Sequence, residues 1–255
     1  MGSRMTRERI DLLLVKRGLA VSRERARSLI LAGKVVCNDR LVDKAGSQVD
    51  TSAEIRLKGE DIPFVGRGGL KLEAALEAFK IDVTGRVAID IGASTGGFSD
   101  CLLQHGVRKV YALDVGYGQL AWSLRCDDRV VVMERTNIRN SVKNDFAETL
   151  ELAVIDLSFI SLTTILPVVK TLLQPESPVI ALVKPQFEVG KGEVGKGGIV
   201  RDDEKRAAAL QKVCDFATNK GFIHQQTITS PISGQKGNIE YLIHLTVDDS
   251  KFDLL

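Results

Sequence analysis

The chain has few cysteines, and they are scattered. Cys37, Cys101, Cys126 and Cys214 form no C-x-x-C pair. They therefore offer neither the ligand spacing of a zinc site nor the density of a disulfide framework, and they fit a reducing compartment. Long apolar runs are lacking too, since none approaches the roughly 18–20 residues that span a bilayer. These absences argue against a metal site, a disulfide scaffold and a membrane-spanning protein, and we expect a cytoplasmic one.

A complete phosphate-binding P-loop is also missing. The stretch GKGEVGKG, from Gly190, has the spacing of such a loop as far as its lysine, but position 197 is glycine. The loop needs serine or threonine there to bind Mg²⁺, so ATP hydrolysis is not expected. We interpret the stretch as a mobile, cationic lid beside a strand that ends at Lys184.

The sequence does have an uneven charge. Residues 1–66 contain 13 lysines and arginines against 9 acids, whereas the remainder contains 22 against 24. A basic head on a nearly neutral body indicates a module that binds a polyanion, joined to a second unit. We predict domains at residues 6–60 and 70–255. The segment DIPFVGRGG, residues 61–69, has one proline and three glycines and is predicted to be a linker.

The head is predicted to fold as two short helices followed by short strands. Residues 10–14 and 26–30 carry apolar side chains at helical spacing, and Ser22 can cap the second helix. Asn38-Asp39 is a plausible hairpin turn. Arg23, Arg25 and Arg27 lie along the second helix, where Glu24 is the only acid that we expect to compensate them. This pattern favours phosphate contact over a merely solvated helix face.

The stretch SRERARSLILAGKVVCNDRLVDKAGSQV resembles the S4-type RNA-binding domain, over roughly residues 6–59. The shared elements are the arginine-bearing helix and the A-G-K-V turn into a strand. The resemblance implies binding to structured RNA through its shape and its phosphates. The residues predicted to bind RNA are Arg23, Arg25, Arg27, Lys34 and Arg40.

The body alternates short apolar runs of strand length with helical segments. The runs are VAIDI, VYALD, VVVME, LAVIDL and VIALVK, and TITS and EYLIHLTV bring the number of strands to seven. Continuous apolar strands that alternate with helices predict an α/β fold whose sheet is mostly parallel and covered on both faces. Ligands of such sheets bind at the carboxyl ends of the strands.

A turn rich in glycine follows the first of these strands, in AIDIGASTGGFSDCLL from Ala88. Its pattern is not the G-x-G-x-x-G of dinucleotide-binding proteins. Asp90 near the end of this strand and Asp114 after the next can accept hydrogen bonds from an ammonium group and a ribose. The pair suits S-adenosylmethionine (SAM) better than a pyrophosphate. The alternative is that Gly96 and Gly97 only serve a tight turn.

Seven stretches in order resemble the TlyA (hemolysin A) family of rRNA methyltransferases, which joins an S4-type domain to an FtsJ-type, Rossmann-like methyltransferase domain. The stretches are RGGLKLEAAL, DIGASTGGFSDCLL, ALDVGYGQL, DLSFISL, VKPQFE, GGIVRD and SPISGQKGNIEYL. The family resemblance implies a catalytic tetrad of Lys71, Asp156, Lys184 and Glu240. With the glycine-rich turn it implies a SAM site at Asp90, Gly92, Ala93, Ser94, Gly96, Gly97, Phe98, Asp114, Val115, Asn137 and Asp156.

The resemblance implies transfer of a methyl group to a ribose 2′-hydroxyl of ribosomal RNA, with no metal and no membrane partner. Lys184 is then the candidate proton acceptor. Read singly, Lys71 could be a surface charge on a helix and Glu240 an acid at a sheet edge. An RNA-binding assembly factor without activity and a membrane-lytic hemolysin remain alternatives. A base methyltransferase is less favoured, because no N-P-P-Y-like motif follows the fourth strand.

Overall fold

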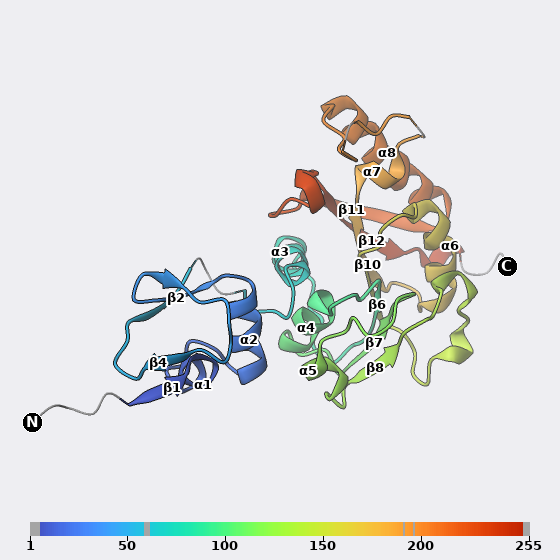
Figure 1. The fold of residues 1–255 in the computed structure, drawn as a ribbon. Coiled ribbons are helices and arrows are strands. Elements are labelled where there is room, and N and C mark those ends of the chain that lie inside the picture. The colour runs from blue at the N-terminus through green and yellow to red at the C-terminus, as the bar shows by residue number, and fades with distance from the viewer. Residues whose placement is uncertain (1–5, 59–61, 191, 196, 252–255) are drawn as a thin grey trace, which may run out of the picture. The chain divides into compact units, whose positions relative to one another are not determined.

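The computed structural model describes residues 6–58, 62–190, 192–195 and 197–251. The chain divides into two compact units, Met1–Asp61 and Ile62–Leu255, here called the head and the body (Figure 1). Lys191 and Lys196 of the predicted lid lie outside the described residues, as do residues 59–61 at the predicted domain boundary.

The head packs two helices against short strands around a small core. Its elements are β1 Arg7–Arg9, α1 Ile10–Lys16, α2 Arg23–Leu31, β2 Val35–Cys37, β3 Arg40–Leu41, β4 Gln48–Asp50 and β5 Ile55–Leu57. Strands pair antiparallel in the order β3-β2-β5, and β1 pairs with β4. The buried side chains include Ile10 and Leu14 of α1 and Ala26 and Ile30 of α2.

Two local predictions for the head are confirmed. Ser22 caps α2, because its Oγ accepts a hydrogen bond of 3.1 Å from the amide of Arg25. Asn38 and Asp39 join β2 to β3 with φ of 47° and 60°, the left-handed pair that a tight hairpin turn requires. The β1–β4 pair was not predicted, since the charged sequence Arg-Glu-Arg carries no alternation of apolar side chains.

The body contains the predicted mostly parallel sheet, with seven strands among the described residues. They are β6 Val87–Ile91, β7 Lys109–Leu113, β8 Val130–Met133, β9 Leu152–Ile155, β10 Pro178–Val183, β11 Phe222–Thr229 and β12 Tyr241–Val247. Their order is β11-β12-β10-β9-β6-β7-β8. Only β12 runs against its neighbours, so its first residue lies at the rim where the parallel strands end.

Helices cover both faces of the sheet (Figure 1). They are α3 Gly68–Phe79, α4 Gly97–Gln104, α5 Trp122–Arg125, α6 Leu162–Leu172, α7 Pro185–Glu188 and α8 Asp203–Asn219, with 3-10 turns η1 Ile138–Asn140, η2 Lys143–Asp145, η3 Gln235–Gly237 and η4 Asp249–Lys251. Val87, Ile89 and Ile91 of β6 share a core with α6 and α8. Ala88 faces the core of α3, α4 and α5, and strand alternation turns Asp90 to that same side.

The prediction of a linker over residues 61–69 is wrong for its described part. Phe64 is buried in the core beside α3, and the amide of Val65 donates a hydrogen bond of 2.7 Å to Asp100 Oδ2. The helix begins at Gly68, and Gly69 packs so tightly against Phe64 that a Cβ there would overlap the ring. The described part of this segment is therefore packed against the body rather than an open tether, and Gly69 is needed for that packing.

Candidate active site

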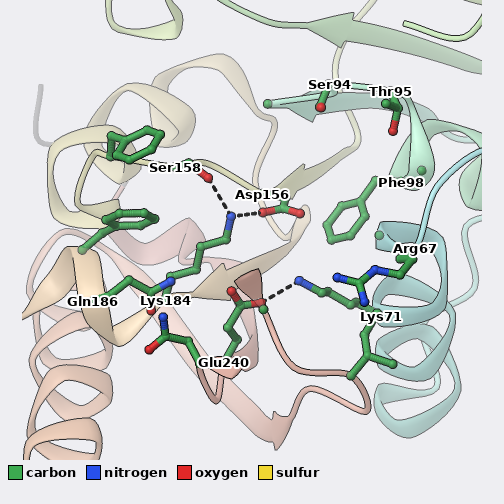
Figure 2. Close-up of a pocket in the computed structure, with 18 of the residues that line it drawn as sticks. Arg67, Lys71, Ser94, Thr95, Phe98, Asp156, Ser158, Lys184, Gln186 and Glu240 are labelled. Carbon is green, nitrogen blue, oxygen red and sulfur yellow. Dashed lines mark hydrogen bonds and ion pairs between the residues drawn. The ribbon is translucent and has the colours of Figure 1, made fainter. Parts of the chain in front are cut away.

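A cavity of about 450 Å³ opens at the carboxyl ends of β6, β9 and β10. Its wall includes two lysines and two carboxylates: Lys71, Asp156, Lys184 and Glu240 (Figure 2). These are the four residues that the family resemblance singled out, and the structure brings them to one place. Ligand sites at this rim are typical of sheets with this topology.

Lys71 and Glu240 form a buried ion pair. Lys71 Nζ donates a hydrogen bond of 2.6 Å to Glu240 Oε2, and the side chains are 10% and 2% exposed. Lys71 comes from the first turns of α3, and Glu240 immediately precedes the reversed strand β12. Gly234 packs against the carboxylate, where a Cβ would overlap Glu240 Oε1. The pair is therefore almost fully buried at the cavity wall, and Lys71 is not the surface charge that its helical position allowed.

Lys184 forms a second pair with Asp156. Its Nζ lies 2.6 Å from Asp156 Oδ1, and the contact is an ion pair too oblique to count as a hydrogen bond. The same ammonium donates a hydrogen bond of 3.0 Å to Ser158 Oγ. Lys184 directly precedes α7, and Pro185 occupies the first helical position, where its missing amide hydrogen is not needed. The contacts with Asp156 and Ser158, together with the neighbouring Pro185, thereby direct the Lys184 ammonium into the cavity.

The glycine-rich turn forms the adjoining wall of the cavity. Gly92 has φ of +89°, and a Cβ there would lie 2.5 Å from the carbonyl oxygen of Asp156. A Cβ on Gly97 would lie 2.9 Å from the amide nitrogen of Gly69. Any side chain at these positions would collide with neighbouring backbone, so both glycines are needed for the turn to pack closely against Asp156 and the start of α3. Ala93, Ser94 and Phe98 line the same wall.

The remaining predicted cofactor residues do not line this cavity in the structure. Val115 is 68% exposed, and Asn137 caps η1 by accepting a hydrogen bond from the amide of Arg139. Gly96, with φ of +95°, packs against Leu124, as a tight strand–helix turn requires. Its place thus fits the structural alternative.

Asp114 braces the turn from the side. Its Oδ2 accepts a hydrogen bond of 2.8 Å from the amide of Ser94, and its Oδ1 accepts one of 2.6 Å from the amide of Gly116. Each carboxylate oxygen has a second lone pair, so both can still accept from a ligand. Asp114 therefore links the ends of two neighbouring strands and keeps acceptor capacity.

Asp90 lies beneath the turn and is completely buried. Its Oδ2 accepts a hydrogen bond of 2.6 Å from Ser99 Oγ, whereas Oδ1 has no hydrogen-bond partner among the described residues. Burial raises the pKa of this carboxyl to about 7, against the lowering effect of Ser99; Asp156 and Asp114 add repulsion. The carboxyl is therefore expected to exchange its proton near neutral pH.

This raised pKa predicts a pH dependence of stability. An unfolded aspartate has a pKa of about 3.9. The folded state then binds more protons between about pH 4 and 7, so Asp90 lowers the free energy of unfolding as pH rises through that window. The loss is on the order of a few kcal/mol. The Asp90→Asn variant, which can still accept from Ser99, is expected to gain stability relative to wild type as pH rises.

The measurement is urea unfolding between pH 5 and 8, followed by the fluorescence of Trp122. This is the single tryptophan of the chain and it lies in the body, so the signal reports that unit. A stability difference between the two proteins that stays constant with pH would contradict the assignment.

Several cavity residues escaped the sequence analysis. Ser158 and Phe159 follow Asp156 in the stretch DLSF and could have been found by inspecting residues beyond each strand end. Phe159 is 90% exposed, has φ of +67°, and its ring centroid lies 5.1 Å from that of Phe187. Arg67 and Lys236 also line the cavity. With them the wall carries four cationic side chains against two carboxylates.

The expectation that Glu24 alone compensates the arginines of the head is wrong. Asp11 of α1 is buried, and its Oδ2 lies 2.9 Å from Arg23 Nε and 3.5 Å from Arg27 Nε. Helical periodicity in each segment alone could not reveal that α1 places an acid under α2. Of the other predicted RNA-binding residues, Lys34 is half-buried and Arg40 is exposed.

Two family models match the chain. The S4 domain matches residues 8–55. The FtsJ-like methyltransferase matches residues 64–247, which is most of the chain. Relatives match over nearly the whole length: YqxC of Bacillus subtilis is 52% identical over 94% of this chain and 85% of that protein. The 16S/23S rRNA (cytidine-2'-O)-methyltransferase TlyA of Mycobacterium tuberculosis is 48% identical over 94% of this chain and 90% of that protein.

The chain belongs to the TlyA branch of the FtsJ-like methyltransferase family. Another relative in this family, Hemolysin A of Brachyspira hyodysenteriae, is 42% identical over 94% of this chain and 100% of that protein. A solved structure from Streptococcus thermophilus that is named as a hemolysin is 48% identical to this chain. It has a TM-score of 0.75 and covers 96% of this chain and 90% of that one. The S-adenosylmethionine dependent methyltransferase from Mesorhizobium loti shares the fold, with 15% identity and a TM-score of 0.52 over 71% and 100%.

Two further observations bear on earlier expectations. No helix in the described part of the chain is both long and apolar enough to cross a membrane. Among the same residues, no group of three or more histidine, cysteine, aspartate or glutamate side chains is placed to hold a metal ion.

Proposed function

We propose that the protein transfers a methyl group from SAM to a ribose 2′-hydroxyl of ribosomal RNA in the cytoplasm, and that its head binds the RNA. The observation that carries this proposal is the meeting of two lysine–carboxylate pairs, Lys71–Glu240 and Lys184–Asp156, in one cavity beside the glycine-rich turn. Relatives named as rRNA (cytidine-2'-O)-methyltransferases support the substrate class.

The body is suited to hold SAM, which supplies an electrophilic methyl group on a sulfonium. Gly92 and Gly97 line the cavity, and Asp114 keeps lone pairs that suit ribose hydroxyls. We assign the cofactor side of the cavity to residues 92–95, Gly97, Phe98 and Asp156, with Asp90 and Asp114 behind them. Val115 and Asn137 follow the next two strands and remain predicted contacts.

The protein's task in such a reaction is to orient the hydroxyl and to take its proton. As the ribose oxygen bonds to the methyl carbon, the carbon–sulfur bond breaks and the hydroxyl proton must leave. Lys184 Nζ, which pairs with Asp156 and donates a hydrogen bond to Ser158, is the acceptor that we assign; it must be neutral to take the proton. Lys71 and Glu240 fix the opposite wall, and such alignment can supply several kcal/mol of the barrier.

The rest of the cavity suits a nucleotide. Exposed aromatic rings stack on unpaired bases in many RNA-binding proteins, and Phe159 lies exposed at the cavity beside Phe187. Arg67 and Lys236 add positive charge that complements the phosphates flanking a target ribose. These residues suit one nucleotide of an RNA chain with its flanking phosphates, rather than a small neutral metabolite.

The test is transfer of a tritium-labelled methyl group to ribosomal RNA from purified subunits, followed by alkaline hydrolysis. A 2′-O-methyl group blocks cleavage at its own phosphodiester, so the label should remain in alkali-resistant dinucleotides. Label in ordinary mononucleotides would indicate base methylation instead. RNA binding without any label would favour an assembly factor, and dye release from liposomes would favour the membrane-lytic alternative.

Removal of the Asp114 carboxylate tests the SAM site. The Asp114→Ala variant should bind SAM at least about fivefold more weakly, since each lost hydrogen bond contributes on the order of 1 kcal/mol and more when charged. Isothermal titration with SAM and with its demethylated product measures this. Asp128→Ala, which removes an exposed acid from the same unit, is the matched control and should bind normally. Unchanged affinity in a folded Asp114→Ala protein would rule out this part of the site.

A further inference from the structure

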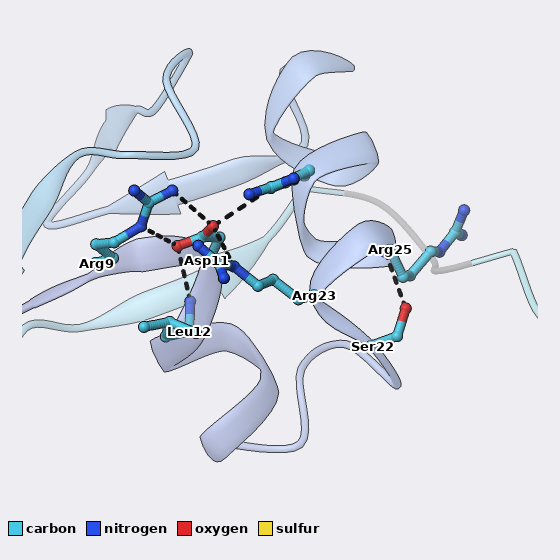
Figure 3. A network of polar contacts seen from close by, with 7 residues as sticks. Arg9, Asp11, Leu12, Ser22, Arg23 and Arg25 are labelled. Carbon is cyan, nitrogen blue, oxygen red and sulfur yellow. Dashed lines mark hydrogen bonds and ion pairs between the residues drawn. The ribbon is translucent and has the colours of Figure 1, made fainter. Parts of the chain in front are cut away.

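One buried carboxylate in the head gathers three arginines (Figure 3). Arg9 forms a two-pronged pair with Asp11, with Nε and Nη2 each donating a hydrogen bond of 2.9 Å to separate carboxylate oxygens. Arg23 donates from Nε at 2.9 Å, and Arg27 Nε lies 3.5 Å away. The three cations come from β1 and α2, and the acid comes from α1.

The arrangement places the negative charge inside and the positive charges outside. The Asp11 side chain has no exposed surface, whereas the side chains of Arg9, Arg23 and Arg27 are 37%, 46% and 49% exposed. The hydrogen bonds from Arg9 hold the pKa of Asp11 well below its usual range, so the carboxylate stays charged at neutral pH. The cluster therefore presents a net charge of about +2 to the solvent.

The contacts also leave donors for another ligand. Arg23 and Arg27 use only Nε toward Asp11, and their Nη groups make no hydrogen bond with any other described residue. A guanidinium offers five N–H donors in a planar fork that matches phosphate. Arg23 and Arg27 are thus held through Nε, while their Nη donors remain available to a phosphate.

We propose that Asp11 is a positioning residue that holds Arg9, Arg23 and Arg27 as a preformed phosphate-binding surface for structured RNA. This inference rests on the proposed function of the head and adds Arg9 to its RNA-binding residues. A polyanion must otherwise order flexible side chains on binding, and each ordered side chain lowers the association constant by roughly twofold to tenfold. Asp11 already orders these arginine side chains in the protein without RNA, so less ordering is needed on binding.

The proposal predicts an effect opposite in sign to simple electrostatics. Asp11→Asn removes one negative charge, so long-range attraction for RNA should increase. An asparagine, however, offers one acceptor oxygen and an amide that repels guanidinium donors, so it cannot hold three arginines. We expect Asp11→Asn to bind ribosomal RNA about fivefold more weakly than wild type despite its added net charge. The log–log salt slope should also fall by about 0.7–0.9 for each RNA phosphate that the arginines no longer neutralise.

Glu24→Gln is the matched control. It removes one negative charge from an exposed side chain in the first turn of α2, and it touches none of the three arginines through a described contact. We expect it to bind RNA as tightly as wild type or slightly more tightly, with an unchanged salt slope. If Asp11→Asn binds as Glu24→Gln does, Asp11 is not a positioning residue and the proposal is overturned.

Two further measurements separate the possible failures. In the wild-type protein without RNA, ¹⁵N relaxation of the arginine Nε–Hε groups should show Arg9, Arg23 and Arg27 rigid, and exposed Arg40 mobile. Equal mobility would overturn the proposal even if Asp11→Asn failed to fold. The Arg23→Ala/Arg27→Ala protein should lose most RNA affinity; if it binds normally, or if the wild type does not bind, the proposed function of the head fails as well.

Discussion

Single-turnover methyl transfer by the Lys184→Arg variant is expected to fall at least a hundredfold below wild type. Arginine keeps the positive charge and can still pair with Asp156, but it does not release a proton near neutral pH. It therefore cannot accept the hydroxyl proton, and general-base steps contribute about 10²–10⁴-fold in rate. The variant should fold and bind SAM and RNA nearly as wild type does, because little buried apolar surface is changed.

The measurement is the rate of tritiated methyl transfer with enzyme in excess over rRNA. Lys220→Arg, the same change at an exposed position of the body, serves as the control and should leave the rate unaltered. If Lys184→Arg keeps more than about a tenth of the wild-type rate, the loss falls short of general-base catalysis. Lys184 would then serve only as an electrostatic positioner.

Breaking the buried pair of Lys71 and Glu240 is expected to have the largest effect on stability. Lys71→Met leaves a carboxylate that is 2% exposed without its cation, and such a loss typically costs about 3–5 kcal/mol. Glu240→Gln should also lower the free energy of unfolding, since it leaves the buried ammonium of Lys71 without its carboxylate. The double variant removes both charges together and should recover much of the lost stability.

A double-mutant cycle measures this coupling, with urea unfolding followed by Trp122 fluorescence. We expect a coupling free energy of a few kcal/mol, in the upper part of the range for contacting residues. Methyl transfer should remain impaired in all three variants, because the wall opposite Lys184 is altered in each. If the losses of stability in the two single variants add up to that of the double variant, Lys71 and Glu240 are close together but not coupled energetically.

Much of the fold could be predicted because its signals are local. Continuous apolar runs such as Val87–Ile91 mark strands buried on both faces, and the helices between them impose parallel crossovers. The turn and cap residues of the head are local signals too: Ser22 caps α2, and Asn38-Asp39 forms a tight hairpin turn. The strands missed by this reasoning, β1 and β4, are three residues long and carry mostly charged or polar side chains.

The grouping of the site residues could not be worked out from local signals. Lys71 and Glu240 are 169 residues apart, and periodicity put Lys71 outside the apolar stripe of its helix. Their contact depends on β12 running against its neighbours, which brings its beginning to the rim where other strands end. Only the family resemblance united them in advance. Asp11 shows the same limit, because the acid that organises the arginines belongs to a different helix.

Every residue that lines the described cavity, from Arg67 to Glu240, belongs to the body. Under the proposed function, the chemistry and the main RNA-binding surface reside in different units of one chain, and the head would act as a tether. A tethered target meets the cavity at an effective concentration that can reach the millimolar range. The cavity itself would then need only weak affinity for its nucleotide, because the head would supply most of the affinity for the RNA.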